Sequence, residues 1–195
     1  MGTVSGQQLV EAVERVSVAA STDPSVPTLG SVLFEGFDST IALVATDRYR
    51  LARRELKWSP GFVSGRVDFL IPAGSLREPI RQLSSASSVT IVSGADSGGR
   101  ELIGFEGPEC RFALPMGTGQ FPDYQSLIPT SSNTRVVVNS SELMQALQLF
   151  PSDKYGISLA FQGMTVTISS NTNESRIRKV PCKVNGPEMK FSCNS

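Results

Sequence analysis

Apolar residues return at helical spacing in three segments of the chain. The segments SGQQLVEAVERV, AGSLREPIRQL and NSSELMQALQLF each carry apolar residues at positions i, i+4 and i+7, which form one stripe along a helix. The stripes are Leu9, Val13 and Val16; Leu76, Ile80 and Leu83; and Leu143, Leu147 and Phe150. The leading leucines of successive stripes are 67 residues apart. This equal spacing predicts an internal repeat.

Each predicted helix follows a polar residue that can cap it. The pairs with the spacing of a capping residue and its reciprocal partner are Ser5 with Gln8, Ser75 with Glu78, and Asn139 with Glu142. Pro79 interrupts the second pattern. If Ser75 is the cap, this proline lies just past the first turn and should distort or delay the helix.

Segments rich in β-branched and aromatic residues surround each predicted helix. VDFLIP and RVVVN precede the second and third helices. The segments that follow the helices are GSVLFEG, STIALVATD and YRLARRELKW; SVTIVSG, ELIGFEG and CRFALPM; and GISLAFQG, MTVTISS and SRIRKVPCKV. Many of them alternate apolar and polar residues, as half-buried antiparallel strands do. We predict an α+β fold of repeated β-α-β-β-β units, with helices on one face of antiparallel sheets.

The segment GTGQFPDYQSLIPTSSN separates the second repeat from the third and contains glycine and proline breaks. We predict a complete domain of two repeats at 1–129 and a half domain of one repeat at 130–195. The half domain is truncated and has no second helix to cover the stripe of Leu143, Leu147 and Phe150. Either the polypeptide continues past Ser195 with a fourth repeat, or the third repeat pairs with its copy in another molecule. For this chain we expect a homodimer through residues 134–195, because equivalent surfaces are self-complementary under a two-fold axis.

The charges of the chain balance. Lysine plus arginine and aspartate plus glutamate both total 18, with 11 basic and 14 acidic residues in 1–129 and 7 and 4 in 130–195. A protein that grips DNA by charge alone usually has a basic excess. No apolar run approaches the roughly 18 residues of a membrane span, and the N-terminus does not resemble a signal peptide. We therefore expect a cytoplasmic protein that does not enter a membrane.

The residues of common catalytic sites are missing. The sequence contains no histidine, no GxSxG and no GxxxxGK[ST] segment, and its carboxylates are scattered singly. The cysteines, Cys110, Cys182 and Cys193, are widely spaced and form no CxxC pair, so we expect free thiols and neither a metal site nor a cofactor. The sequence predicts a protein that is not an enzyme.

One segment, VATDRYRLARRELKW, is dense in positive charge. Five basic residues lie within ten positions, beside Tyr49 and Trp58: Arg48, Arg50, Arg53, Arg54 and Lys57. One interpretation is a strand with a solvated charged face. The other is a rim of arginine and tyrosine around a binding groove, since both residue types are enriched at binding hot spots.

Two sets of motifs resemble a known family. The segments PTLGSVLFE (27–35) and VATDRYRLA (44–52) resemble the middle domain of the bacterial DNA polymerase III beta subunit, the replicative sliding clamp. The segments GQFPDY (119–124) and LIP (127–129) resemble its link to the last domain. The resemblance covers essentially the whole chain. It implies a DNA-clamp fold, rings that encircle duplex DNA, and a hydrophobic pocket that holds polymerases and repair proteins.

The resemblance also assigns site residues. The partner-peptide pocket would include Leu29, Thr46, Arg48, Tyr49, Arg50, Leu51 and Pro129. The apolar members would form its floor and the polar members its anchors, with a plain core position as the alternative for Leu29 and Leu51. DNA-facing helices of this family are basic. Here they offer Arg15, Arg77 and Arg81, with none on the third helix, which predicts weak binding of duplex DNA without sequence preference.

A regulatory function is the alternative. Clamp-like modules that resemble this sequence also occur attached to MerR-type helix-turn-helix regulators, where they would sense or oligomerise. The balanced charge and poorly basic helices favour this alternative, and the motifs favour the clamp. We also expect the pocket wall that the family draws from its far C-terminus to be missing.

Overall fold

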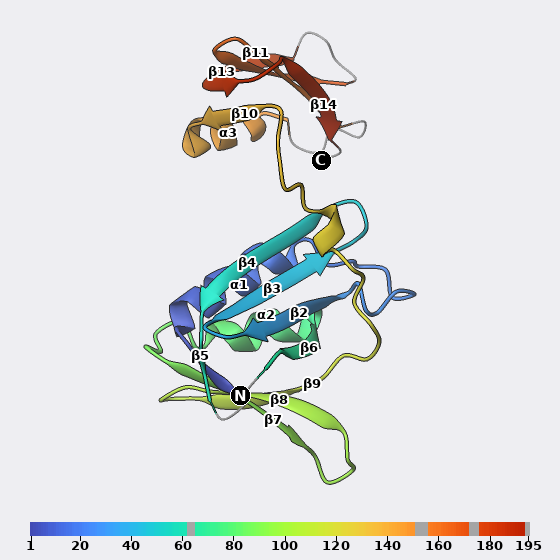
Figure 1. The fold of residues 1–195 in the computed structure, drawn as a ribbon, viewed down its shortest axis with the longest axis vertical. Coiled ribbons are helices and arrows are strands. Elements are labelled where there is room, and N and C mark those ends of the chain that lie inside the picture. Colours follow the sequence, from blue (N-terminus) through green and yellow to red (C-terminus); the bar gives the residue numbers. More distant parts are fainter. Residues whose placement is uncertain (62–64, 151–155, 172–175, 194–195) are drawn as a thin grey trace. The chain divides into compact units, whose positions relative to one another are not determined.

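The computed structural model describes residues 1–61, 65–150, 156–171 and 176–193. The chain separates into two compact parts, an N-terminal unit (Met1–Pro122) and a C-terminal unit (Asp123–Ser195). This division lies slightly before the predicted boundary at residue 129. Blue to yellow segments in Figure 1 form the N-terminal unit, and orange to red segments form most of the C-terminal unit.

Two β-α-β-β-β repeats build the N-terminal unit (Figure 1). The first repeat comprises β1 (Gly2–Val4), α1 (Gly6–Ser17), β2 (Ser31–Phe37), β3 (Thr40–Thr46) and β4 (Leu51–Lys57). After the short β5 (Ser59–Pro60), the second repeat comprises β6 (Val67–Pro72), α2 (Ala73–Arg81), β7 (Val89–Ala95), β8 (Glu101–Glu106) and β9 (Arg111–Pro115). All strand pairs are antiparallel, which confirms the predicted fold class.

The two repeats exchange their first strands. One sheet has the order β4-β3-β2-β6 and the other β5-β1-β7-β8-β9. Strand β6 therefore lies on β2 of the first repeat, while β1 lies on β7 of the second. Each repeat completes the sheet of the other, which no local sequence signal predicted.

One apolar core joins both sheets to both helices of the N-terminal unit. The stripes Leu9, Val13 and Val16, and Leu76, Ile80 and Leu83, are at most 1% exposed. The rings of Phe34 and Phe69 stack at 4.9 Å between neighbouring strands. Full burial of such side chains contributes about 1.5–3 kcal/mol each. The first two predicted stripes are thus confirmed as the surface on which the helices pack.

Helix caps follow the prediction at two of three positions. The Ser5 side chain accepts a hydrogen bond from the amide of Gln8, and Asn139 accepts bonds from the amides of Ser141 and Glu142 at 3.0 and 3.2 Å. The predicted cap at Ser75 is wrong. Helix α2 begins earlier, directly after Pro72, so Ser75 lies inside the first turn and its hydroxyl donates back to the Pro72 carbonyl at 3.0 Å. Pro79 lies inside the helix.

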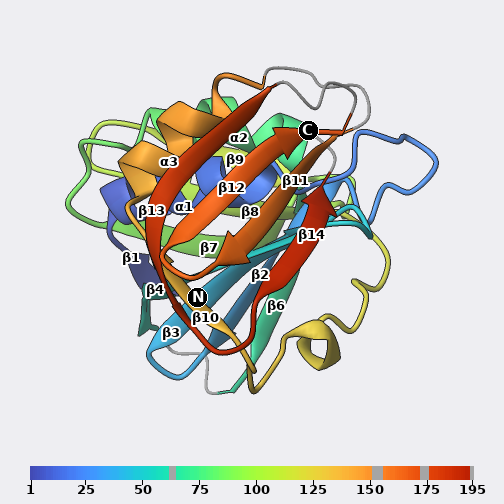
Figure 2. The same ribbon diagram turned by 90° about the horizontal axis from the view of Figure 1, so that it is seen from above.

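A third repeat forms most of the C-terminal unit. After the 3-10 helix η1 (Gln125–Leu127), the elements are β10 (Arg135–Val138), α3 (Ser140–Leu147), β11 (Ile157–Gln162), β12 (Thr165–Ser170), β13 (Ile177–Asn185) and β14 (Met189–Cys193). Their sheet has the order β10-β13-β12-β11-β14, and Figure 2 shows its last four strands side by side. Strand β14 was not predicted. No described helix of the chain is long and apolar enough to cross a membrane.

The apolar stripe of the third helix (Leu143, Leu147 and Phe150) is covered more fully than predicted. Phe150 is only 3% exposed, and Leu143 and Leu147 are half-buried. All three pack on a core that includes Val166 and Ile168 from the same sheet. The expectation that a lone repeat leaves its whole stripe uncovered was therefore wrong, because the inner face of its own sheet receives Phe150 and part of both leucines. Met144 on the neighbouring helix surface is 61% exposed.

Candidate functional site

The turn between β3 and β4 is held by the Thr46 side chain. Thr46 is 8% exposed, its hydroxyl donates to the Arg50 carbonyl at 2.8 Å, and its oxygen accepts from the Arg48 amide at 3.2 Å. Its hydrogen-bonding capacity is thus used within the turn. The hydroxyl fixes the shape of the turn, and the role of Thr46 as a polar anchor for a partner stays a prediction.

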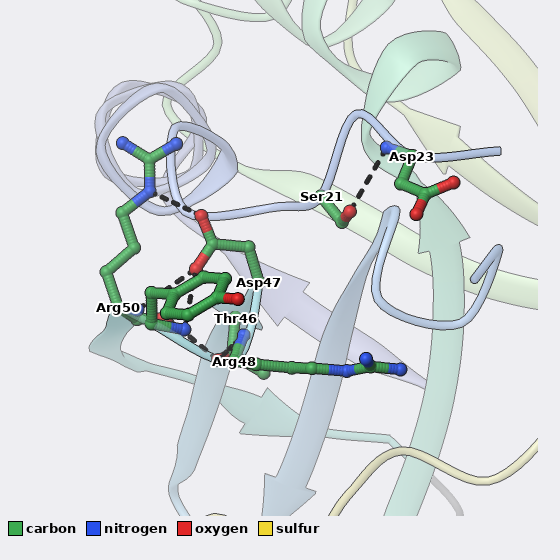
Figure 3. Close-up of polar contacts among 7 residues, drawn as sticks. Ser21, Asp23, Thr46, Asp47, Arg48 and Arg50 are labelled. Carbon is green, nitrogen blue, oxygen red and sulfur yellow. Dashed lines mark hydrogen bonds and ion pairs between the residues drawn. The ribbon is translucent and has the colours of Figure 1, made fainter. Parts of the chain in front are cut away.

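The Asp47 carboxylate closes the same turn (Figure 3). One oxygen accepts hydrogen bonds from the amides of Tyr49 and Arg50, both at 3.0 Å. The other oxygen lies 2.8 Å from Nε of Arg50, with which it forms an ion pair. Asp47 was not among the predicted site residues, although aspartate at the start of a tight turn is a readable signal.

Arg48 and Tyr49 form the exposed tip of the turn. Arg48 has a φ of 82°, in the left-handed region that disfavours side chains with a Cβ. Tyr49 is 97% exposed. Figure 3 shows the Arg48 and Arg50 side chains extending away from the turn in different directions. Among the described residues, Arg48 has no ion-pair partner. The turn therefore presents an aromatic ring and an unpaired guanidinium to solvent.

Two carboxylates near these arginines stay ionised. Partial burial raises the pKa of Asp47, but hydrogen bonds from the Arg50 and Tyr49 amides and from the Arg50 guanidinium outweigh it, so this pKa lies below its usual range. The pKa of Asp23 is also lowered, first by the Ser25 amide, then by the Ser25 side chain, and least by the charge of Arg48. The loop that carries Asp23 thus lies within electrostatic reach of the turn (Figure 3).

The apolar residues assigned to the pocket differ in burial. Leu29 is 6% exposed but is not part of the core between sheets and helices. Leu51, the first residue of β4, is half-buried. Because Leu33 pairs with Val44, the start of β2 and the end of β3 lie at the same end of the sheet. This register places Leu29, just before β2, at the end of the sheet that carries the turn.

Pro129 lies in the C-terminal unit, just after η1, and its side chain is exposed. Its role as part of the pocket stays a prediction. The structure therefore gathers six of the seven assigned residues at one end of a single sheet, and all six belong to the N-terminal unit. The positive φ of Arg48 had no sequence signal, because glycine or asparagine is the usual residue there.

The predicted DNA-facing arginines lie on α1 and α2, which pack side by side. Arg15 and Arg77 are exposed. Arg81 instead pairs with Glu14 at 2.8 Å and with Glu78 at 3.3 Å, and the hydrogen bond that it donates to Glu14 raises its pKa. The prediction counted Arg81 as an available cation and missed both glutamates.

Comparisons with known proteins agree on one family. Residues 3–123 match the family model described as the DNA polymerase III beta subunit, central domain. The chain is 34% identical to the beta sliding clamp of Micrococcus luteus over 186 residues, which cover 93% of the chain and 59% of that clamp. It is 29% identical to the beta sliding clamp of Streptomyces coelicolor over 198 residues, covering 99% of the chain and 53% of that clamp. The chain thus spans little more than half the length of these relatives.

Solved structures show the same fold. The crystal structure of the DNA polymerase sliding clamp from Bacillus subtilis superposes with a TM-score of 0.84 at 24% identity, covering 100% of this chain and 52% of that one. The sliding clamp from Pseudomonas aeruginosa superposes with a TM-score of 0.81 at 26% identity, covering 97% of this chain and 53% of that one. Since the family model spans more than half of the chain, this protein belongs to the DNA polymerase III beta subunit family, the bacterial sliding clamps.

Proposed function

We propose that this chain is part of a replication processivity clamp, which encircles duplex DNA and tethers polymerase or repair proteins through a peptide pocket. The observation that carries the proposal is the family match over residues 3–123, a segment that contains the whole β3–β4 turn. The curated relatives compared above are named beta sliding clamps. They do not support the alternative of a MerR-type regulator.

In this proposal, 1–129 is a complete clamp domain and 130–195 is half of another. The reciprocal strand exchange between β1 and β6 supports the first assignment, because each repeat of the N-terminal unit completes the other. The presence of one repeat in the C-terminal unit supports the second. We place the protein in the cytoplasm, where bacterial replication occurs.

The partner pocket of this proposal lies at the β3–β4 turn. Tyr49 offers an exposed aromatic face, Arg48 an unpaired cation, and Leu29 and Leu51 an apolar surface at the same end of the sheet. Such a set of apolar floor and convergent polar groups suits a short hydrophobic peptide. The assignment of Pro129 to this pocket rests on the family resemblance alone.

The family consists of processivity factors without catalysis of their own, and we propose the same for this chain. The absence of histidine from the sequence supports this, as does the lack of any metal-binding cluster of three or more His, Cys, Asp or Glu residues in the described part of the chain. Turnover that follows the protein through purification, and that a single substitution abolishes, would overturn this part of the proposal.

A peptide-binding measurement tests the central claim. The fluorescence anisotropy of a labelled hydrophobic clamp-binding peptide should rise when this chain is added, and an unlabelled copy of the peptide should displace it. A scrambled peptide of the same composition is the matched control. Equal binding of both peptides, or binding of neither, would contradict the proposed pocket.

We further propose that the chain self-associates as a homodimer through residues 134–195. The half-buried Leu143 and Leu147 and the exposed Met144 support this, because they leave an apolar surface on α3 that a second copy would cover.

A further inference from the structure

The sheet of the C-terminal unit has one face on its core and one face in solvent. Val166, Ile168 and Val180 lie in the core on which the stripe of α3 packs. Because successive side chains of a strand point to opposite faces, the residues between them point away from that core. This second face, formed by β11, β12, β13 and β14, is the outer face of the C-terminal sheet (Figure 2).

One row of paired residues crosses the outer face of the C-terminal sheet and has a lysine at each end. From β13 to β14 its members are Lys179, Thr167, Ala160 and Lys190. Both lysines are exposed, while the two residues between them are short and half-buried. Lys183 lies four residues after Lys179 on β13, so alternation places it on the same face. The outer face therefore carries three lysines around a floor of small side chains.

The matching sheet of the N-terminal unit, β4-β3-β2-β6, pairs opposite charges on its outer face. Arg66 forms ion pairs with Glu35 and with Asp68, each at 2.6 Å. In the C-terminal sheet, the part of the chain that the structure describes offers no ion-pair partner to any of the three lysines. Glu188, in the loop before β14, is exposed and pairs with none of them. The three positive charges are therefore open to another molecule.

The spacing of the lysines suits an extended acidic polypeptide. Lys179 and Lys183 lie about 13 Å apart along β13, because a strand rises by about 3.3 Å per residue. Lys179 and Lys190 lie about 14 Å apart, across the strand spacings from β13 to β14. An extended segment with acidic residues four positions apart matches the first distance, and the short side chains of Thr167 and Ala160 leave room for a chain between the lysines.

The composition of the outer face favours a polypeptide over a nucleic acid. Proteins that bind nucleic acids commonly use arginine forks on phosphates and aromatic rings that stack on bases. The described strand residues of the outer face include neither an arginine nor an aromatic residue. Lysines and hydroxyl groups such as that of Thr167 are point donors, which suit separate carboxylates.

We propose that the outer face of the C-terminal sheet binds an acidic polypeptide segment of a partner protein. The segment is extended, and Lys179, Lys183 and Lys190 hold its carboxylates through charge-assisted hydrogen bonds. This surface lies on other elements than the proposed peptide pocket at the β3–β4 turn. It is a second interaction surface, and its binding does not depend on that pocket.

A labelled oligo-glutamate peptide is the probe that tests this surface. Its fluorescence anisotropy should rise when the chain is added at low salt, and the affinity should fall as salt is raised, because exposed ion pairs are screened. An oligo-glutamine peptide of the same length is the matched probe and should not bind. The triple variant Lys179→Gln, Lys183→Gln and Lys190→Gln should bind oligo-glutamate about tenfold more weakly than the parent, because it loses all three ion pairs.

Two further triple variants separate the position of the positive charge from its amount. Replacing the same three lysines by arginine keeps the charge on the face and should leave the affinity within about twofold of the parent. Lys57→Gln with Arg100→Gln and Arg111→Gln removes three exposed cations from the N-terminal unit instead, and should weaken binding by less than about twofold. The lysine-to-glutamine variant should still bind the hydrophobic clamp-binding peptide as the parent does.

The outcomes that would overturn the proposal are distinct from those that test the pocket. Equal affinity of the parent for oligo-glutamate and oligo-glutamine, with intact folding by circular dichroism, would overturn the acidic segment as the ligand. Equal losses in the lysine variant and in the control variant of the N-terminal unit would overturn the outer face as its site. A single-stranded oligonucleotide of equal charge that binds the parent more tightly than oligo-glutamate, and loses this binding in the lysine variant, would assign the face to nucleic acid instead.

Discussion

Arg48 holds an unfavourable backbone conformation at the tip of the β3–β4 turn. Its φ of 82° is open to glycine without steric penalty, whereas a residue with a Cβ loses on the order of 1 kcal/mol there. The hydrogen bonds of Thr46 and Asp47 impose this conformation from both sides of the residue. The strained backbone therefore lies at the residue whose side chain the turn holds in solvent.

Arg48→Gly should consequently stabilise the N-terminal unit by at most about 0.5 kcal/mol, because the greater freedom of glycine in the unfolded chain offsets much of the gain from relieved strain. Chemical denaturation followed by circular dichroism measures the change. Arg54→Gly, at an exposed position of β4 with ordinary strand geometry, is the control and should be destabilising. A loss of stability in Arg48→Gly would show that the turn does not strain this residue.

Tyr49 and Arg50 differ in what they contribute to the turn. Tyr49 is 97% exposed, so Tyr49→Ala should weaken peptide binding by roughly thirtyfold without lowering stability, since aromatic hot spots contribute about 2 kcal/mol or more. Arg50→Ala should weaken binding and also lower stability by a few tenths of a kcal/mol, because it removes an exposed ion pair to Asp47. Peptide anisotropy and denaturation report the two effects separately. If both variants fold and their affinity for the peptide is unchanged, the β3–β4 turn is a solvated loop and not a binding site.

At the scale of elements, local signals predicted most of the structure. The strand β6, Val67–Pro72, coincides with the predicted segment VDFLIP, because alternation and β-branching act within a few residues. The short strands β1 and β5 and the strand β14 were missed, since two to five residues carry too little pattern. The cap of α2 was missed for another reason. A proline can start a helix without a side-chain acceptor, so the serine signal was misleading.

The predicted cap at Asn139 was confirmed and the one at Ser75 was wrong, so the effects of substitutions at these two residues on stability can be compared directly. Asn139→Ala should destabilise the C-terminal unit by about 1 kcal/mol, because it removes the acceptor for the Ser141 and Glu142 amides at the start of α3. Ser75→Ala should change stability by less than about 0.5 kcal/mol, since its hydroxyl only bonds back to the Pro72 carbonyl. Thermal unfolding of both variants beside the parent measures the difference. Equal losses of stability in the two variants would mean that the Asn139 cap does not stabilise α3.

At the scale of the whole molecule, the arrangement between repeats could not be predicted. The equal spacing of Leu9, Leu76 and Leu143 revealed that repeats exist, but not that β1 and β6 change places. Strand exchange depends on backbone pairing between distant segments, which leaves no local signature. The pocket could not be predicted from local sequence signals either. Its residues came from the family resemblance, whereas the proximity of Asp23 to the turn emerges only from the folded geometry.

Under the proposed function, the charges on α1 and α2 predict how strongly this chain would bind DNA. On α1 and α2 the acidic side chains Glu11, Glu14 and Glu78 balance the basic side chains Arg15, Arg77 and Arg81. At most about three phosphates can be neutralised per chain, which gives a log–log salt slope no steeper than about −3. Because Arg81 already pairs with Glu14 and Glu78, the observed slope should lie closer to −2.

Glu14→Gln tests this balance, since it removes the carboxylate 2.8 Å from the Arg81 guanidinium. Affinity for a short duplex at low salt should rise by roughly threefold and the slope should steepen by up to about one, because Arg81 becomes available to a phosphate. Glu109→Gln changes the net charge equally, at an exposed position between β8 and β9, and is the matched control. Anisotropy titrations between low and physiological salt distinguish the two. If both variants gain affinity equally, net charge alone governs binding. If the salt slope of the parent protein is much steeper than −3, or if its affinity depends on the DNA sequence, another surface holds the DNA.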